Sequence, residues 1–141
     1  MTTSRTRRQP EYRNIGFGDI TMKYRMPLAA ILSILHRVSG ALLFLFLLFL
    51  PFLLFLFDQS LTSELSFEVF KAFLSNIVVK LIVLALSSAF LHHFCAGIRH
   101  LLMDVNHDAV SKEGGKRTAV VVFVVSIALT IAMALKLFGA F

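Results

Sequence analysis

The chain has 141 residues, of which 57% are hydrophobic and 16% are charged, and its mean hydropathy is +0.81. This composition lies far outside the range of soluble globular domains, so we expect an integral membrane protein. The net charge of +6 does not indicate nucleic-acid binding, which needs a soluble basic surface, and we expect the basic residues to set membrane orientation instead.

Residues 1–27 form a polar, basic arm that precedes the first apolar run. The length of this arm, and the lack of a small-residue cleavage site after the run, argue against a signal or transit peptide. We therefore expect the first apolar segment to be retained. The arm has the composition of a segment that contacts anionic lipid head groups or a docked partner.

Three segments are apolar and long enough to cross a bilayer, namely 28–57, 77–103 and 118–137. The first is too long for one straight crossing, so we expect 38–57 to occupy the hydrocarbon core and Pro51 to kink the helix. The sequence thus predicts an all-α protein, with a domain of three transmembrane helices over residues 28–141.

The distribution of lysine and arginine predicts the orientation of these spans. Six basic residues precede Pro27, whereas the first loop offers Lys71 together with three acidic residues. The second loop carries Lys112, Lys116 and Arg117. Because cytoplasmic loops are enriched in lysine and arginine, we expect the N-terminus and the second loop to be cytoplasmic.

Polar side chains gather at the predicted cytoplasmic ends of the first two spans. They are Ser33, His36 and Arg37 on the first span and Arg99, His100 and Asp104 on the second. A single transmembrane histidine can serve helix packing alone, and a single arginine can simply reach the head groups. Together these residues form one layer at matching depth, and intramembrane ionisable residues are functional candidates.

His93, Gly97 and His100 share one face of the second span, because four and seven residues correspond to about one and two helical turns. His92 points about 100° away from His93. A neutral imidazole beside a glycine, where a flat group can lie against the helix, suits a haem iron ligand, and the cationic layer suits haem propionates. A second axial ligand would come from His36, from another chain or from nowhere, and we expect His36 to lie too near the interface to share an iron with His93.

Two other classes of protein must be weighed against this interpretation. A dihaem cytochrome b of the four-helix kind needs paired histidines on two helices for each haem, whereas the deep histidines here occur on the second span only. A non-redox membrane protein would use the polar layer for packing or substrate passage. An absorption spectrum with one haem per chain, two haems or none would separate the three classes.

Several smaller features predict structure and carry no chemistry. Cys95 is the only cysteine, which excludes an internal disulfide and a thiolate metal cluster built by this chain alone. Gly114 and Gly115 lack the rest of a phosphate-binding pattern, so we expect a turn there. Ala128 and Ala132 on the third span are expected to make helix contacts.

Two motifs connect these residues to a known family. The pattern S-x-x-H-R-x-S-G over 33–40 and the pattern H-x-x-x-G-x-R-H-x-x-x-D over 93–104 closely resemble the signatures of the cytochrome b subunit of succinate dehydrogenase, respiratory complex II. Length, three spans and a cytoplasmic N-terminus agree with that family. The resemblance therefore covers nearly the whole chain.

This resemblance implies a haem b site shared with a second membrane-anchor subunit, which completes the helical bundle. His93 stands at the position of the haem axial ligand, and His36, Arg37 and His100 stand at positions that hold the propionates. The sequence departs from the family in having His92 immediately before that position. We favour His93 over His92 as the ligand, because His93 alone shares a face with Gly97 and His100.

The resemblance also implies a ubiquinone site near the cytoplasmic surface, formed by Ser33 and Arg37, with Asp104 close to it as a source of protons. Ser33 and Arg37 are four residues apart and so are neighbours on one helical face. The implied partners are an iron–sulfur subunit and a flavoprotein subunit, because this chain has no sites for those centres. The implied reaction is electron transfer from succinate to ubiquinone, and the lack of a transit peptide favours a bacterial plasma membrane.

Overall fold

The computed structural model describes residues 16–19 and 25–139, and this part of the chain is all-helical. Most of the basic arm expected over residues 1–27 lies outside the described residues. The elements are, in chain order, α1 (Leu28–Leu47), α2 (Leu50–Ser60), α3 (Glu64–Ser75), α4 (Ile77–Val105), the short 3-10 helix η2 (His107–Val110) and α5 (Lys112–Leu137).

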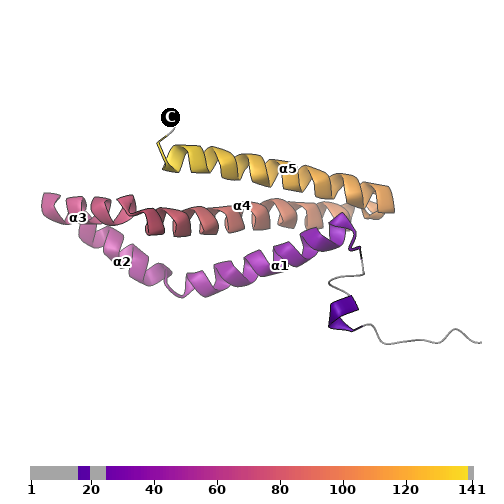
Figure 1. Ribbon diagram of the computed structural model, residues 1–141, viewed down its shortest axis with the longest axis horizontal. Coiled ribbons are helices and arrows are strands. Elements are labelled where there is room, and N and C mark those ends of the chain that lie inside the picture. The colour runs from indigo at the N-terminus through magenta and orange to yellow at the C-terminus, as the bar shows by residue number, and fades with distance from the viewer. Residues whose placement is uncertain (1–15, 20–24, 140–141) are drawn as a thin grey trace, which may run out of the picture.

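Helix α4 is the centre of the arrangement, and α1 and α5 pack against its two sides (Figure 1). At the far end of α1 the chain bends into α2, which runs on to meet α3. Helix α3 then leads almost in line into α4. Helices α1 and α4 carry all the candidate site residues named from the sequence.

Helices α1, α4 and α5 have the length and apolar composition needed to cross a membrane. At about 1.5 Å per residue, the 20 residues of α1 already span a hydrocarbon core of about 30 Å, and α4 with 29 residues exceeds it. Three long apolar helices are thus confirmed within the described part of the chain. The caps of α4 and α5 are polar, because Asn76 and Ser111 accept hydrogen bonds from the first-turn amides of these helices.

The first apolar segment is divided into two helices. Helix α1 ends at Leu47, two residues form a turn, and α2 begins at Leu50 with Pro51 in its first turn. Proline is favoured there because it lacks the amide hydrogen that a first turn leaves unpaired. The predicted break near Pro51 is confirmed, and the helix before it, which is long and apolar enough to cross a membrane, covers 28–47. Consequently, His36 lies well inside α1 and not at the end of the apolar stretch.

The turn expected at Gly114 and Gly115 is wrong. Both glycines lie in the first turn of α5, which begins six residues before the predicted start at 118. The Ser111 side chain accepts from the Gly114 amide at 3.1 Å and caps the helix. A Cβ at Gly114 would collide with the carbonyl oxygen of Asp108, so a residue without a side chain allows η2 to fold tightly onto α5.

The buried core is small and lies where α1, α4 and α5 meet. It consists of Leu32, Ala96, Ala119 and Val122. Small residues at the crossing let the helix backbones approach closely, as is usual for helix packing in membranes. Ala128 and Ala132, which were expected to make such contacts, are exposed within this chain. Many large leucine and phenylalanine side chains face outward, as suits a lipid-facing surface.

Candidate functional site

The ring of His93 on α4 lies against the backbone of α1. Its Nδ1 atom is 3.0 Å from the carbonyl oxygen of His36 and 3.3 Å from Oγ of Ser39. The Ser39 hydroxyl in turn donates to the same His36 carbonyl at 2.9 Å. A carbonyl oxygen can only accept, so Nδ1 must carry the proton of a neutral imidazole. This arrangement leaves Nε2 of His93 with a free lone pair.

Gly40 makes room for this ring. A Cβ at Gly40 would lie 2.8 Å from Cε1 and 3.2 Å from Nδ1 of His93. Both distances are shorter than those at which a Cβ normally contacts other heavy atoms. Since the helix backbone at Gly40 is ordinary, the residue is required by the close approach of the ring and not by its own conformation. Ser39 and Gly40 together form the seat of the His93 imidazole.

The ring of His36 stacks on the ring of His93, with centroids 4.1 Å apart and planes 13° from parallel. The ring of His36 also contacts the ring of His100, with centroids 5.0 Å apart and planes tilted by 46°, and its Nε2 would lie 3.7 Å from a Cβ at Gly97. The ring of His36 therefore lies against that of His93, although the sequence placed the two histidines at different depths. The space left by Gly97 faces the imidazole of His36.

His92 faces α5, whereas His93 faces α1. Its Nδ1 is 3.5 Å from Oγ of Ser126 on α5, and its ring lies 5.8 Å from that of Phe123. Nε2 of His92 is buried without a hydrogen-bond partner among the described residues. The sequence prediction that the two adjacent histidines point in different directions is confirmed, because His93 contacts α1 while His92 contacts α5.

Arg99 also points toward α5 and away from the histidine stack. Its Nε donates to Thr118 Oγ1 at 3.0 Å, and one terminal nitrogen donates to the Gly115 carbonyl at 3.3 Å. The side chain is 4% exposed. Arg99 follows the predicted depth of the polar layer but does not face α1, and it joins α4 to α5 instead.

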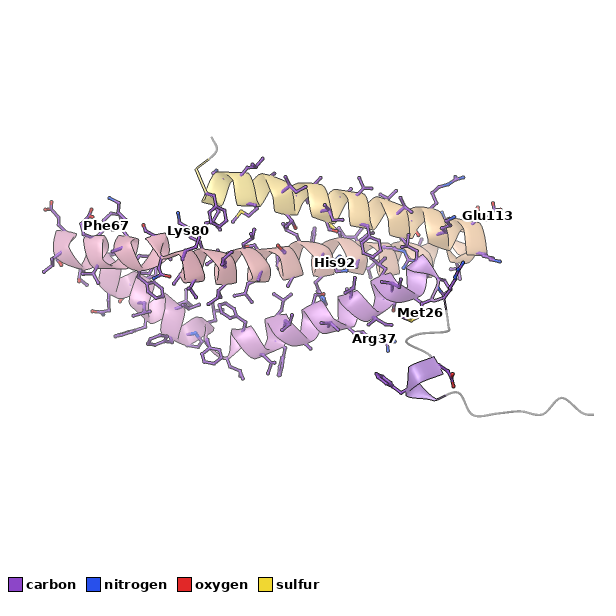
Figure 2. All side chains as sticks on the ribbon, in the orientation of Figure 1. Met26, Arg37, Phe67, Lys80, His92 and Glu113 are labelled. Carbon is purple, nitrogen blue, oxygen red and sulfur yellow. The ribbon has the colours of Figure 1, made fainter. Side chains whose placement is uncertain are left out.

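The remaining predicted site residues lie on the surface of this chain or near it. Ser33 is half-buried on α1, whereas Arg37 and Asp104 are exposed. Arg37 follows His36 directly, and its side chain projects away from α4 (Figure 2). The structure thus gathers His36, His93 and His100 into one stack and leaves the cation of Arg37 available to groups outside the chain.

Sequence reasoning missed the roles of Ser39 and Gly40, although both belong to the first motif. The signal that could have identified them is a pair of small residues within a helix of large apolar side chains. Such a pair marks a place where another helix approaches closely. The motif therefore combines a histidine side chain, a backbone acceptor and a gap for a ring from another helix.

Comparison with known proteins agrees with this arrangement. Residues 9–133 match the model of the succinate dehydrogenase/fumarate reductase transmembrane subunit family. The chain belongs to this family. It is 42% identical over 109 residues to the succinate dehydrogenase cytochrome b556 subunit of Coxiella burnetii, a match that covers 77% of this chain and 83% of that protein.

The same comparison finds two rickettsial proteins called succinate dehydrogenase cytochrome b556 subunit. Those of Rickettsia felis and Rickettsia prowazekii are 31% and 30% identical over 86 residues, which is 60% of this chain and 62% of each relative. The chain is accordingly a multi-pass cytochrome b membrane subunit of succinate dehydrogenase and one component of that complex.

Proposed function

We propose that this chain binds haem b through Nε2 of His93. The observation that carries the proposal is the contact between Nδ1 of His93 and the His36 carbonyl, which leaves the other ring nitrogen unprotonated. A histidine ligand needs this lone pair, and its second nitrogen is typically held by a carbonyl or carboxylate. The three relatives have names that include cytochrome b556, which supports the same assignment.

The rings of His36 and His93 are stacked face to face at 4.1 Å, so one of the two would hold the iron and the other would support it. His93 would hold the iron and His36 would support the ring of His93. A second membrane subunit would complete the haem site. His100 and Arg37 are the groups of this chain that would hold the propionates, because a buried carboxylate needs a charged or polar partner.

Bound haem would supply one-electron storage between the soluble subunits and the membrane. The chain would orient the ligand ring through Ser39 and Gly40. Nε2 of His36 is buried beside Gly97 and has no hydrogen-bond partner among the described residues.

We further propose that Ser33, Arg37 and Asp104 line the ubiquinone-reduction site. A hydroxyl and a guanidinium one turn apart on α1 can donate to a quinone oxygen, and the permanent cation stabilises the negative charge that develops during reduction. Asp104 is exposed in the last turn of α4 and can exchange protons with bulk water.

These roles require partners on the cytoplasmic side. We propose that a flavoprotein subunit and an iron–sulfur subunit deliver electrons from succinate, and that the N-terminus and the start of α5 face the cytoplasm of a bacterial cell. The support is the positive charge at the start of α5, which includes Lys112, Lys116 and Arg117.

Optical spectra of the assembled complex test the haem proposal. His93→Ala should lose the b-type absorption band of this haem, whereas His92→Ala should keep it, since His92 faces α5. The matched pair controls for the removal of one imidazole from the same helical turn. An unchanged spectrum in an assembled His93→Ala complex, or loss of the band only in His92→Ala, would overturn the assignment.

A further inference from the structure

The main-chain carbonyl of His36 receives two side-chain donors, which come from different helices. The Ser39 hydroxyl on α1 donates to this oxygen at 2.9 Å, and Nδ1 of His93 on α4 donates to it at 3.0 Å. The oxygen also lies inside α1, where a carbonyl ordinarily accepts from the amide four residues later. A carbonyl oxygen has two lone pairs, so these donors must share it. The Ser39 hydroxyl therefore competes with the His93 ring for one acceptor.

The surroundings of Ser39 hold its hydroxyl in this competition. The side chain is 6% exposed, and Oγ lies 3.3 Å from Nδ1 of His93. Because Nδ1 carries the proton of the neutral ring, it offers the hydroxyl no lone pair. Rotation away from the His36 carbonyl would leave a buried O–H group without an acceptor among the described residues. The hydroxyl thus stays on the carbonyl that the ring also uses.

The acceptor at Nδ1 controls how well the other nitrogen of the ring donates to a metal. A strong acceptor at Nδ1 of His93 draws its proton outward and makes Nε2 a better electron donor. A better donor stabilises oxidised iron and lowers the reduction potential of a bound haem. Each further donor on the His36 carbonyl weakens its pull on the Nδ1 proton. A hydroxyl that occupies part of this oxygen therefore favours reduced iron.

We propose that Ser39 is a positioning residue that raises the reduction potential of the haem, because it shares the His36 carbonyl with Nδ1 of His93. This role rests on the proposed ligation of the iron by His93. It adds to that ligation a group of this chain that sets how readily the haem accepts an electron. On reduction the iron gains one electron, and Nδ1 keeps its proton.

A closely similar arrangement on α5 offers a matched control. Ser126 is 3% exposed and donates to the carbonyl of Phe123, three positions earlier, at 3.3 Å. Its Oγ lies 3.5 Å from Nδ1 of His92. Ser126→Ala therefore removes a buried hydroxyl from beside an imidazole that does not hold the iron in the proposed site.

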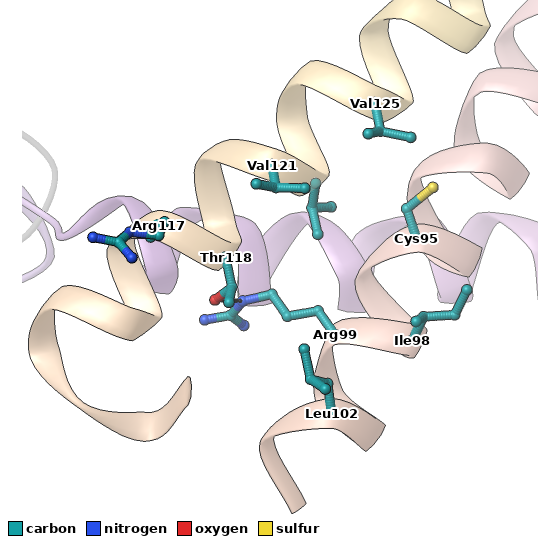
Figure 3. Close-up of a pocket in the computed structure, with 9 residues that line it drawn as sticks. Cys95, Ile98, Arg99, Leu102, Arg117, Thr118, Val121 and Val125 are labelled. Atoms are coloured by element: carbon teal, nitrogen blue, oxygen red, sulfur yellow. Dashed lines mark hydrogen bonds between the residues drawn. The ribbon is translucent and has the colours of Figure 1, made fainter. Parts of the chain in front are cut away.

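Potentiometric titration of the haem band in the assembled, purified complex tests the proposal. In Ser39→Ala the ratio of reduced to oxidised haem at a fixed potential should fall about threefold, which corresponds to about 30 mV for one electron. Ser39→Thr keeps a hydroxyl that can reach the same carbonyl, so the wild-type potential should return. Ser126→Ala should also keep it, since Arg99 and Thr118 still join α5 to α4 (Figure 3).

Ser39→Cys separates the hydrogen bond from the volume of the side chain. A thiol fills the space but is a weak donor, so this variant should lower the potential in the same direction as Ser39→Ala. An unchanged potential in Ser39→Ala with haem retained would overturn the proposal. A higher potential would overturn it as well, because Oγ would then act mainly as a second acceptor for Nδ1 of His93. An equal shift in Ser126→Ala would exclude a role specific to Ser39.

Failure of this role is distinguishable from failure of the haem assignment. If His93→Ala loses the haem band while Ser39→Ala keeps the wild-type potential, only the role of Ser39 is refuted. If the band survives in an assembled His93→Ala complex, the ligand assignment is refuted and the role of Ser39 with it.

Discussion

Nδ1 of His93 on α4 lies 3.0 Å from the main-chain carbonyl oxygen of His36 on α1. This contact connects the two motifs of the sequence through a backbone atom, while the side chain of His36 stacks on the same ring. The contact therefore defines which nitrogen of His93 carries the proton, and the acceptor is a group whose own protonation does not change.

The seat of the His93 ring can be tested at Gly40. Gly40→Ala should improve helix propensity by about 1 kcal/mol, but its Cβ would lie 2.8 Å from Cε1 of His93. Overpacking of this kind costs about 1–3 kcal/mol, so we expect the ring to be displaced and haem retention to fall by on the order of tenfold. The measurement is haem per complex after purification. Ala41→Val, which adds carbons at the next and exposed position, is the control, and equal haem loss in both variants would argue against a specific seat.

The proposed quinone site can be tested at Arg37. Arg37→Gln removes a permanent cation, and a charge-assisted hydrogen bond contributes about 1.5–3 kcal/mol. Quinone reduction by the assembled complex should therefore fall at least about tenfold, while succinate oxidation by a soluble artificial dye should be largely retained. Arg25→Gln removes an exposed cation before α1 and should affect neither rate. A parallel loss of both activities in Arg37→Gln would exclude a role specific to quinone.

The junction of α4 and α5 can be tested at Thr118. Thr118→Val keeps the shape of the side chain but removes the acceptor for Nε of the buried Arg99. An unsatisfied buried donor costs about 1–3 kcal/mol, so we expect a lower temperature of half-unfolding for the purified complex. Thr130→Val, on α5 about three turns further along, is the matched control. Equal thermal stability of wild type and Thr118→Val would show that this hydrogen bond contributes little.

Sequence reasoning predicted the long apolar helices and the directions of the two adjacent histidines. Both follow from properties that a single helix carries by itself, namely apolar length and a period of 3.6 residues. The opposite orientations of His92 and His93 needed no knowledge of a neighbouring helix.

Other features depended on how one helix lies against another. The leucine and phenylalanine run of α1 and α2 has no periodicity that marks where the helix breaks, so His36 was expected at a different depth from His93. Arg99 contacts Thr118 on α5, which begins before Gly114 and Gly115. Local sequence preference assigns that pair of glycines to a turn, so this contact was not predicted. The roles of Ser39 and Gly40 appear only when the ring from α4 is in place.

The main-chain acceptor for His93 has a consequence for assembly. Every amino acid at position 36 supplies the same oxygen, so a point substitution there does not delete it, whereas a slide of α1 by one residue moves it by about 1.5 Å and turns it by about 100°. In the proposed haem site, such a slide would take the acceptor away from Nδ1 of His93, and the proton would no longer be held on that nitrogen. Haem binding would then depend on the register of α1 against α4.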